Sequence, residues 1–355
     1  MGNLPKHLPA LEELMIEGCE ELACSLPRAP KLCKLKVSGG MRLEEVPESL
    51  HDITIESTPL AKSVLESLAR TQPPHLQCID IRDCWADISI SWDHFPASIQ
   101  QLTIWCCSNL TFSGQLQQQS LKEIFISGCD SLKLFPLVAL PNLEELEIRS
   151  CRNLECIEVP QDHDDHVFPS LRHLWIHRCP RLASISTLVL AAPSLEKLTI
   201  KCCSEIDSFP DVGLPSSLRV LDINKCPKLT RWIISRGLHS EGLTRLSLSR
   251  CYKVKSFPRE GCLPTSLESL RIRKFRHLET LDCKALLHLT FLKQLKVWCC
   301  WKLKNMTEEK LPASITQLAI TRCPLRSKLE SMNDPLIYSE DEYFSLSDDT
   351  ESEDE

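Results

Sequence analysis

A short pattern of apolar residues, repeated along almost the whole chain, limits most strongly how this sequence can fold. From residue 143 the sequence reads Leu-Glu-Glu-Leu-Glu-Ile-Arg-Ser-Cys-Arg-Asn-Leu, with apolar side chains at Leu143, Leu146, Ile148 and Leu154 and a small thiol at Cys151. Close or looser copies occur 14 times, and their starts lie 18 to 28 residues apart. The copies begin at Leu11, Leu32, Leu50, Leu76, Ile99, Leu121, Leu143, Leu171, Leu195, Leu218, Leu243, Leu267, Leu292 and Ile315.

This period is the signature of leucine-rich repeats. The central Leu-x-Ile segment alternates between two faces as a short strand does. The flanking leucines can be buried only when neighbouring copies stack, so one repeat alone would not fold. The sequence therefore predicts an α/β solenoid over residues 1–330. We expect a curved leucine-rich-repeat horseshoe of about 14 repeats, with a parallel β-sheet on its concave face.

The segments between the strands are predicted to be mostly irregular or 3₁₀. The chain has 23 prolines and only 10 glycines, and proline fixes φ and removes a backbone donor. One exception is expected between residues 61 and 74, where Val64, Leu65 and Leu68 have helical spacing. That spacing predicts one short helix on the convex side.

The chain has 20 cysteines, and 11 of them occupy one repeat position, which we name the cysteine slot. A small thiol can point inward there and donate a weak hydrogen bond to a neighbouring backbone. Inward-pointing thiols on adjacent strands are not expected to pair systematically as disulfides. Reduced thiols, together with an N-terminus that has no apolar signal core, indicate a cytoplasmic or nuclear protein. The slot cysteines are Cys19, Cys84, Cys107, Cys129, Cys151, Cys179, Cys203, Cys226, Cys251, Cys300 and Cys323.

Two kinds of segment leave a metal or redox role open. The doublets Cys106-Cys107, Cys202-Cys203 and Cys299-Cys300 are each expected to place one thiol in the slot and one on the exposed face. Residues 161–166 read Gln-Asp-His-Asp-Asp-His, which could bind a metal, although a solvated loop insertion between repeats is the favoured interpretation.

Motifs of catalysis are absent from the sequence. It contains no phosphate-binding glycine loop, no nucleophile elbow and no Cys-x-x-Cys pair. His173 and His177 lie on either side of Trp175 on one strand face, which indicates a surface and not a catalytic triad. We therefore expect a non-enzymatic protein without a cofactor or a metal site.

The variable positions of each strand are predicted to face the concave surface, because the repeated apolar ones face the core. Over repeats one to seven these positions hold eleven acidic and five basic residues. Over repeats eight to fourteen they hold fourteen basic and three acidic residues. The concave face should therefore be acidic at its start and basic at its end.

Large aromatic rings are also expected on this surface, where exposed Trp beside Arg is typical of partner-binding centres. The alternative is that neighbouring long side chains shield the rings. We hypothesise that Trp175, with its basic neighbours, belongs to a docking surface for an acidic protein segment. The predicted partner-binding residues are Trp105, Phe125, Arg172, Trp175, Arg178, Lys201, Arg245, Arg271 and Trp298.

The repeat pattern ends near Ser331, and residues 331–355 are predicted to form an acidic disordered tail. Residues 339–355 carry nine acidic residues and no basic one. Ser345, Thr350 and Ser352 each have an acidic residue three places on, as acidophilic kinases favour, although simple solvation explains these acids as well.

The cysteine-centred repeat, the lead-in at 263–267 (Leu-Pro-Thr-Ser-Leu) and the Ser-Phe-Pro endings at 208–210 and 256–258 carry a family resemblance. Over residues 1–326 the chain resembles the C-terminal leucine-rich-repeat region of plant intracellular nucleotide-binding disease-resistance receptors, especially the coiled-coil class. The resemblance implies recognition of a pathogen effector or a guarded host protein, and restraint of an upstream nucleotide-binding domain. No such domain precedes Leu11, so we expect a fragment or truncated product. Nucleotide binding cannot be carried over.

Two other classes remain open. A substrate-recognition subunit of a ubiquitin ligase, or another stand-alone leucine-rich-repeat adaptor, would present a similar surface but needs an adaptor-binding helical module. An extracellular receptor would need a signal peptide and glycosylation sites, and only Asn109-Leu110-Thr111 and Asn305-Met306-Thr307 match that motif. Nucleic acid is not expected as a partner, because the charges are mixed. A membrane is not expected either, since no apolar run of about 18 residues occurs.

Overall fold

The computed structural model describes residues 4–19, 26–39, 43, 45–114, 119–160, 168–307 and 310–325. The predicted acidic tail and the histidine-containing segment 161–166 therefore lie outside the described residues. The helices are α1 Thr58–Thr71, α2 Ser186–Leu190 and α3 Pro227–Arg236, with 3₁₀ turns η1 Trp92–His94 and η2 Lys284–Leu286. Among the described residues, no helix is both long enough and apolar enough to cross a bilayer.

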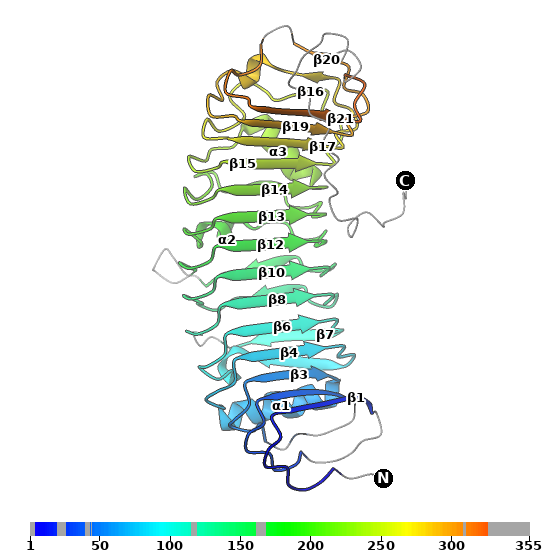
Figure 1. The fold of residues 1–355 in the computed structure, drawn as a ribbon, viewed down its shortest axis with the longest axis vertical. Coiled ribbons are helices and arrows are strands. Elements are labelled where there is room, and N and C mark those ends of the chain that lie inside the picture. The colour runs from blue at the N-terminus through cyan, green and yellow to red at the C-terminus, as the bar shows by residue number, and fades with distance from the viewer. Residues whose placement is uncertain are drawn as a thin grey trace.

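One parallel sheet runs the length of the molecule (Figure 1). It has 14 strands, which follow one another in chain order. Every strand begins two residues after one of the 14 repeat starts, so the predicted repeat solenoid and its sheet are confirmed. The strands are β1 Glu13–Cys19, β2 Lys34–Gly39, β3 Asp52–Glu56, β4 Cys78–Arg82, β6 Gln101–Trp105, β8 Glu123–Ser127, β10 Glu145–Arg149, β12 His173–His177, β13 Lys197–Lys201, β14 Val220–Asn224, β15 Arg245–Ser249, β17 Ser269–Arg273, β19 Gln294–Trp298 and β21 Gln317–Thr321.

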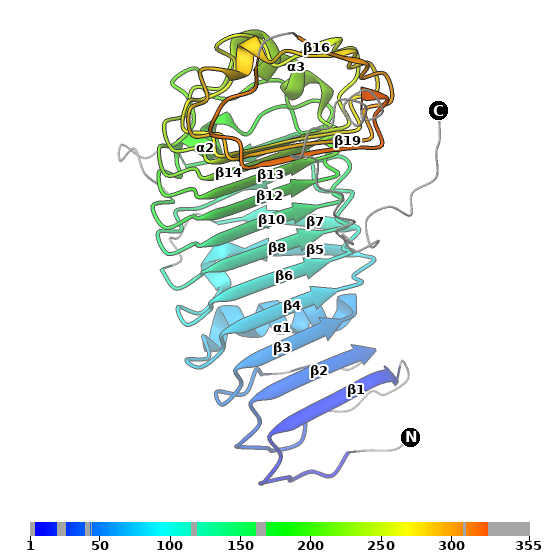
Figure 2. The same ribbon diagram turned by 45° about the horizontal axis from the view of Figure 1, so that its top comes forward.

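Figure 2 shows the chain coiling back behind this sheet. A continuous apolar core fills the inside of that coil. The second and fourth residues of a strand point inward, and Leu146 and Ile148 of β10 are fully buried. Neighbouring strands keep the same register, so Leu146 lies between Ile124 and Leu174. Each inward row is therefore a ladder of Leu and Ile, and the ladder is closed only by the repeats on either side.

A left-handed backbone position precedes every cysteine slot from β4 onward. Ser150, for example, has φ of 51° and donates its backbone N–H to the His177 carbonyl of the next repeat at 2.8 Å. This conformation ordinarily favours Gly, yet Arg178 and Lys225 also adopt it, each with φ of 55°. The turn therefore adds one more bond to the sheet ladder and redirects the chain into the core.

The slot thiols behave as predicted in most repeats. Cys151 is fully buried, and its Sγ donates to the Arg149 carbonyl, two residues back, at 3.3 Å. All the cysteines in the described ranges are free thiols. Cys19 is the exception to burial, because it lies in the terminal strand β1 and is exposed.

The prediction for the doublets is wrong in part. Cys299 is only 8% exposed and does not lie on an open face. Cys106 and Cys202 are half-buried. The physical reason is that all three occupy the left-handed turn position, with φ between 50° and 56°, which tucks the side chain against the next repeat.

Burial should make the slot thiols inert to alkylation. Burial raises the pKa of the Cys179 and Cys251 thiols to about 12. At pH 8 only about one thiol in ten thousand would then be ionised, against about a quarter for an ordinary Cys. We expect iodoacetamide to label exposed Cys19 at pH 8 in the folded protein while sparing buried Cys179 and Cys251, as peptide mass spectrometry would show. Equal labelling of all three thiols in the folded protein would contradict this prediction. Equal labelling that occurs only after unfolding would agree with it.

Three small sheets and three helices line the opposite side of the coil. The predicted helix over 61–74 is present as α1, displaced by three residues, with Leu60, Val64 and Leu68 buried. The sequence did not predict α2, α3 or the short parallel sheets. The short strands are β5 Asp87–Ser91 with β7 Asn109–Ser113, β9 Leu134–Pro136 with β11 Cys156–Glu158, and β16 Ser256–Phe257 with β18 Thr280–Leu281 and β20 Asn305–Met306.

A cluster of aromatic rings sits beneath these short strands. Trp92 of η1 is fully buried, and its ring lies 5.4 Å from that of Phe112 and 6.2 Å from that of Phe135. The Trp92 indole Nε1–H donates to the Pro136 carbonyl at 3.0 Å. Rings therefore fill the convex side where the repeats carry no regular helix.

Candidate protein-binding surface

The outward side chains of the 14-stranded sheet form three straight rows, and we name this surface the sheet face. Its members are the first, third and fifth residues of each five-residue strand, such as Glu145, Glu147 and Arg149 of β10. The constant register places Glu147 beside Phe125 and Trp175. Because adjacent strands lie about 4.8 Å apart, each side chain touches its row neighbours. The rows therefore display a different residue at almost every step, over a core that is apolar throughout.

Two of the predicted concave positions lie outside these rows. The residue before each strand, such as Arg172, stands on the entry edge, where its Nη1 lies 3.4 Å from Glu196 Oε1. The residue before each slot, such as Arg178, stands in the left-handed turn at the exit edge. The prediction that all variable positions share one face is therefore wrong for these two, since the strand has ended before the turn begins.

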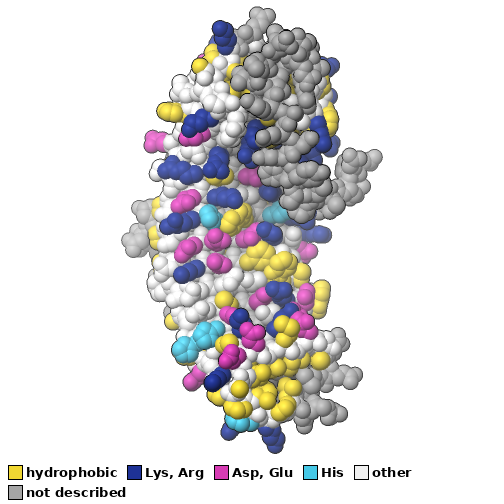
Figure 3. Space-filling view, in the orientation of Figure 1, with side chains coloured by type: hydrophobic (Ala, Val, Ile, Leu, Met, Phe, Trp, Pro, Cys, Tyr) yellow, Lys and Arg dark blue, Asp and Glu magenta, His cyan; other side chains and the backbone are white. Residues whose placement is uncertain are grey.

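Charge is divided along the sheet face (Figure 3). Strands β1 to β10 present eight acidic and four basic side chains in the three rows. Strands β12 to β21 present six basic side chains and one acidic, Asp222. The exit edge is basic there too, and carries Arg178, Lys225, Arg250, Lys274 and Arg322.

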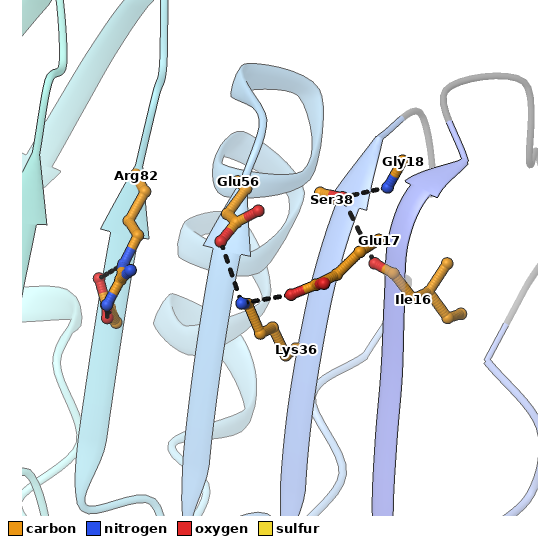
Figure 4. A network of polar contacts seen from close by, with 8 residues as sticks. Ile16, Glu17, Gly18, Lys36, Ser38, Glu56 and Arg82 are labelled. Carbon is orange, nitrogen blue, oxygen red and sulfur yellow. Dashed lines mark hydrogen bonds and ion pairs between the residues drawn. The ribbon is translucent and has the colours of Figure 1, made fainter.

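In the acidic half, the basic residues are held by carboxylates. Lys36 of β2 lies between Glu17 of β1 and Glu56 of β3 (Figure 4). The hydrogen bond that the Lys36 ammonium donates to Glu17 raises the pKa of that ammonium. Arg82 and Arg149 pair with Asp80 and Glu147 of their own strands. The excess of acids in this half is therefore partly neutralised from within.

The basic half carries an excess of bases, and two of them are neighbours within one row. Arg271 of β17 is register-paired with Lys296 of β19. Asp222 is the one acidic group of these rows: burial raises the pKa of its carboxyl, while Lys201, Lys197 and Arg271 oppose that shift. A positive field over β13 to β19 follows from this arrangement.

Aromatic rings stand on the sheet face in three places. Trp105 is 39% exposed and packs 5.0 Å from Phe125, over which Arg149 lies at 5.6 Å. Trp175 is half-buried, with the His173 ring at 5.2 Å and Lys197 at 5.6 Å. Trp298 is half-buried beneath Lys296 at 5.9 Å. The rings are thus shielded by neighbours yet remain accessible.

The nine predicted binding residues do not form one cluster. Trp105 of β6 and Phe125 of β8 lie on adjacent strands with their rings 5.0 Å apart, whereas Trp175 and Arg245 are three strands apart, about 14 Å. Arg245 and Arg271 lie on adjacent strands, and Lys201 lies beside His177 of β12. The set therefore spans the centre and the basic half as a strip.

Sequence reasoning missed a ridge along the exit edge. The Arg276 guanidinium lies 5.5 Å from the ring of Tyr252, and Trp301 occupies the equivalent position one repeat later with 58% of its surface exposed. All three follow the slot position directly. This constant position, one residue after the slot, is the sequence signal that could have predicted the ridge.

The first histidine of β12 contacts a carboxylate of the neighbouring strand. His173 Nδ1 lies 2.9 Å from Glu145 Oε1 of the neighbouring strand. In the described part of the chain, no group of three or more His, Cys, Asp or Glu side chains could hold a metal ion.

Plant disease-resistance proteins are similar to this chain in sequence. A putative disease resistance protein of Arabidopsis thaliana is 30% identical over 321 residues, covering 82% of this chain and 22% of the relative. Disease resistance protein RPS4B of the same plant is 26% identical, covering 64% of this chain and 20% of the relative. TMV resistance protein N of Nicotiana glutinosa is 26% identical, covering 63% and 23%. The chain spans about one fifth of these relatives.

No family model matches the chain. Among solved structures, YopM from Yersinia enterocolitica is 17% identical, covers 88% of this chain and 79% of its own, and superposes with a TM-score of 0.32. The fold assignment rests on the 14-stranded repeat sheet of the chain itself.

Proposed function

We propose that this chain is the recognition part of a plant disease-resistance protein. The similarity of the chain to such proteins over most of its length supports this proposal. In this role it acts as a non-enzymatic leucine-rich-repeat scaffold in the defence response. The finer assignment to the coiled-coil class stays a prediction, because the names of the relatives give no class. A cytoplasmic or nuclear location follows from the same proposal and from the free thiols.

One observation carries the recognition role. Along the sheet the inward residues repeat as Leu, Ile and Cys, whereas the outward residues differ at almost every strand. A surface that varies over an invariant core can be fitted to a ligand without loss of stability. The partner we propose is a protein, either a pathogen effector or a guarded host protein, and in a longer chain also the nucleotide-binding domain. No observation on the described residues favours the ubiquitin-ligase alternative.

The central strip of the sheet face is the proposed docking surface for an acidic segment of that partner. It offers Trp175, whose ring is partly shielded by Lys197, and exposed Arg245 three strands away. Partly desolvated Trp and Arg side chains are the usual energetic centres of protein interfaces. Their separation of about 14 Å suits an extended segment of about four residues.

The double change Trp175→Ala with Arg245→Ala is expected to lower partner capture at least tenfold, about 1.4 kcal/mol of binding free energy. Quantitative mass spectrometry of proteins that co-purify with the full chain from infected plant tissue would measure this. Trp85→Ala with Lys62→Ala, both exposed and off the three rows, is the matched control. Unchanged capture by the first double variant would refute the docking surface.

A further inference from the structure

The basic half of the sheet face carries an unusual concentration of like charge. We name it the basic strip and define it as Lys197, Lys201, Arg245, Arg271, Arg273 and Lys296 of strands β13 to β19. Asp222 is the one acid in its rows. Arg271 and Lys296 are directly opposed in the parallel register, and like charges so placed destabilise a sheet. An anionic occupant would relieve that repulsion.

The end of the described chain lies close to this strip. Leu325 is buried, and its backbone N–H donates to the Leu303 carbonyl at 2.8 Å, directly after the last strand, β21. Five strand steps separate β21 from β13, or about 24 Å. The thirteen residues from 326 to 338 can extend to about 43 Å. Residues 339–355 can therefore reach every strand of the basic strip.

The chemistry of residues 339–355 complements the strip. They contain nine acidic residues and no basic one. Tyr343 and Phe344 stand among the acids, and Tyr338 just precedes them. The strip also borders an aromatic side chain that these rings could contact, because Arg273 is register-paired with Trp298. Guanidinium groups both pair with carboxylates and stack on rings, so acids and rings together give a more selective fit than acids alone.

We propose that the acidic C-terminal segment 339–355 binds the basic strip of its own chain and competes there with the acidic partner. The proposal rests on the docking surface proposed above. It adds that a segment of the same chain competes with the partner for that surface. A tethered segment acts at an effective concentration in the millimolar range, so even weak binding would keep the strip covered. The acidic half of the sheet face would stay open, because its excess of carboxylates repels the segment.

A direct test measures access to the strip in the full chain. The wild type is compared with an amide variant, in which the nine acidic residues of 339–355 become Asn or Gln. Fluorescein-labelled poly-glutamate serves as the probe, followed by anisotropy at low salt. We expect the amide variant to bind the probe at least tenfold more tightly than the wild type.

Substitutions on the strip should move binding in both directions. In the amide variant, Arg245→Glu with Arg271→Glu is expected to abolish probe binding, whereas Lys62→Glu with Lys304→Glu, exposed positions away from the three rows, should leave it intact. Asp222→Asn removes the one acid of the strip and should strengthen binding severalfold. Circular dichroism checks that each variant is folded. A gain of binding cannot come from a folding defect, so Asp222→Asn is the more telling change.

A zero-length carbodiimide cross-link, read by mass spectrometry, locates the segment in the wild type. We expect links from 339–355 to Lys197, Lys201 and Lys296, and not to Lys34 or Lys36 of the acidic half. Mixing nitrogen-15-labelled and unlabelled protein separates links within one chain from links between two. Links only between chains would overturn the intramolecular proposal.

The remaining outcomes separate the two proposals. Equal probe binding by the wild type and the amide variant would overturn the competing segment and leave the docking surface standing. No probe binding by either would overturn both. Tighter binding of poly-uridine RNA than of poly-glutamate to the amide variant would assign the strip to nucleic acid, and so overturn the proposed occupant.

Discussion

Trp92→Ala is expected to lower the free energy of unfolding by about 4 kcal/mol. The side chain is fully buried against Phe95, Phe112 and Phe135, and truncating a buried Trp typically costs about 3–5 kcal/mol. The change also leaves the Pro136 carbonyl without its indole donor, which contributes to that loss. Stacked repeats have no other part of the core to compensate, since each contacts only its neighbours.

Urea unfolding followed by circular dichroism measures the loss caused by Trp92→Ala, and hydrogen exchange locates it around η1, β7 and β9. Trp85→Ala is the matched control, because that ring is 72% exposed and its loss should change stability by less than about 0.5 kcal/mol. If the two variants unfolded at the same urea concentration, the aromatic cluster would not support the convex side as described.

Gly242→Ala should cost about 3 kcal/mol although it adds a single methyl group. A Cβ at this position would lie 1.9 Å from the Ser216 carbonyl oxygen and 2.6 Å from Arg219 Nη1. The backbone oxygen cannot yield as a side chain would, so the two repeats must move apart. Arg219 also donates to the Gly242 carbonyl at 2.9 Å, and that bond would be strained.

The displacement would reach the sheet face, because β15 starts at Arg245, three residues later. We therefore expect Gly242→Ala to weaken partner capture as well as stability. Gly261→Ala is the control: its φ is +72° but no heavy atom lies within 4 Å of the added Cβ, so only about 1 kcal/mol is expected. Thermal denaturation of both variants gives the comparison, and an equal loss in the two would exclude the backbone clash as the cause.

The strands could be predicted because their determinants are local and repeated. Leu146 and Ile148 recur at the same spacing in every copy, and each copy became one strand of the sheet. The helix α3 was not predicted, because the many prolines of the chain favour irregular segments and Pro227 stands directly after a slot cysteine. Proline is in fact favoured in the first turn of a helix, where its missing N–H costs nothing.

The surface was predictable in charge but not in geometry. The excess of bases in the second half follows from residue types alone. The position of Arg178 depended on where β12 ends and the left-handed turn begins, and a repeat pattern with several non-glycine residues at that point does not signal positive φ. Likewise, the shielding of Trp175 depends on the neighbouring strand that supplies Lys197.

The strictly sequential order of the 14-stranded sheet has a consequence for how such a gene can change. Each strand pairs only with the strand before it and the strand after it. A recombination event that duplicates or removes one whole repeat therefore leaves every other strand with two neighbours of the same kind. Such an event shifts the border between acidic and basic strands by one step of about 4.8 Å. Point substitution, in contrast, alters one position of one row. Unequal crossing-over and single-base change are thus two separate ways of renewing the same surface while the Leu and Ile ladders stay intact.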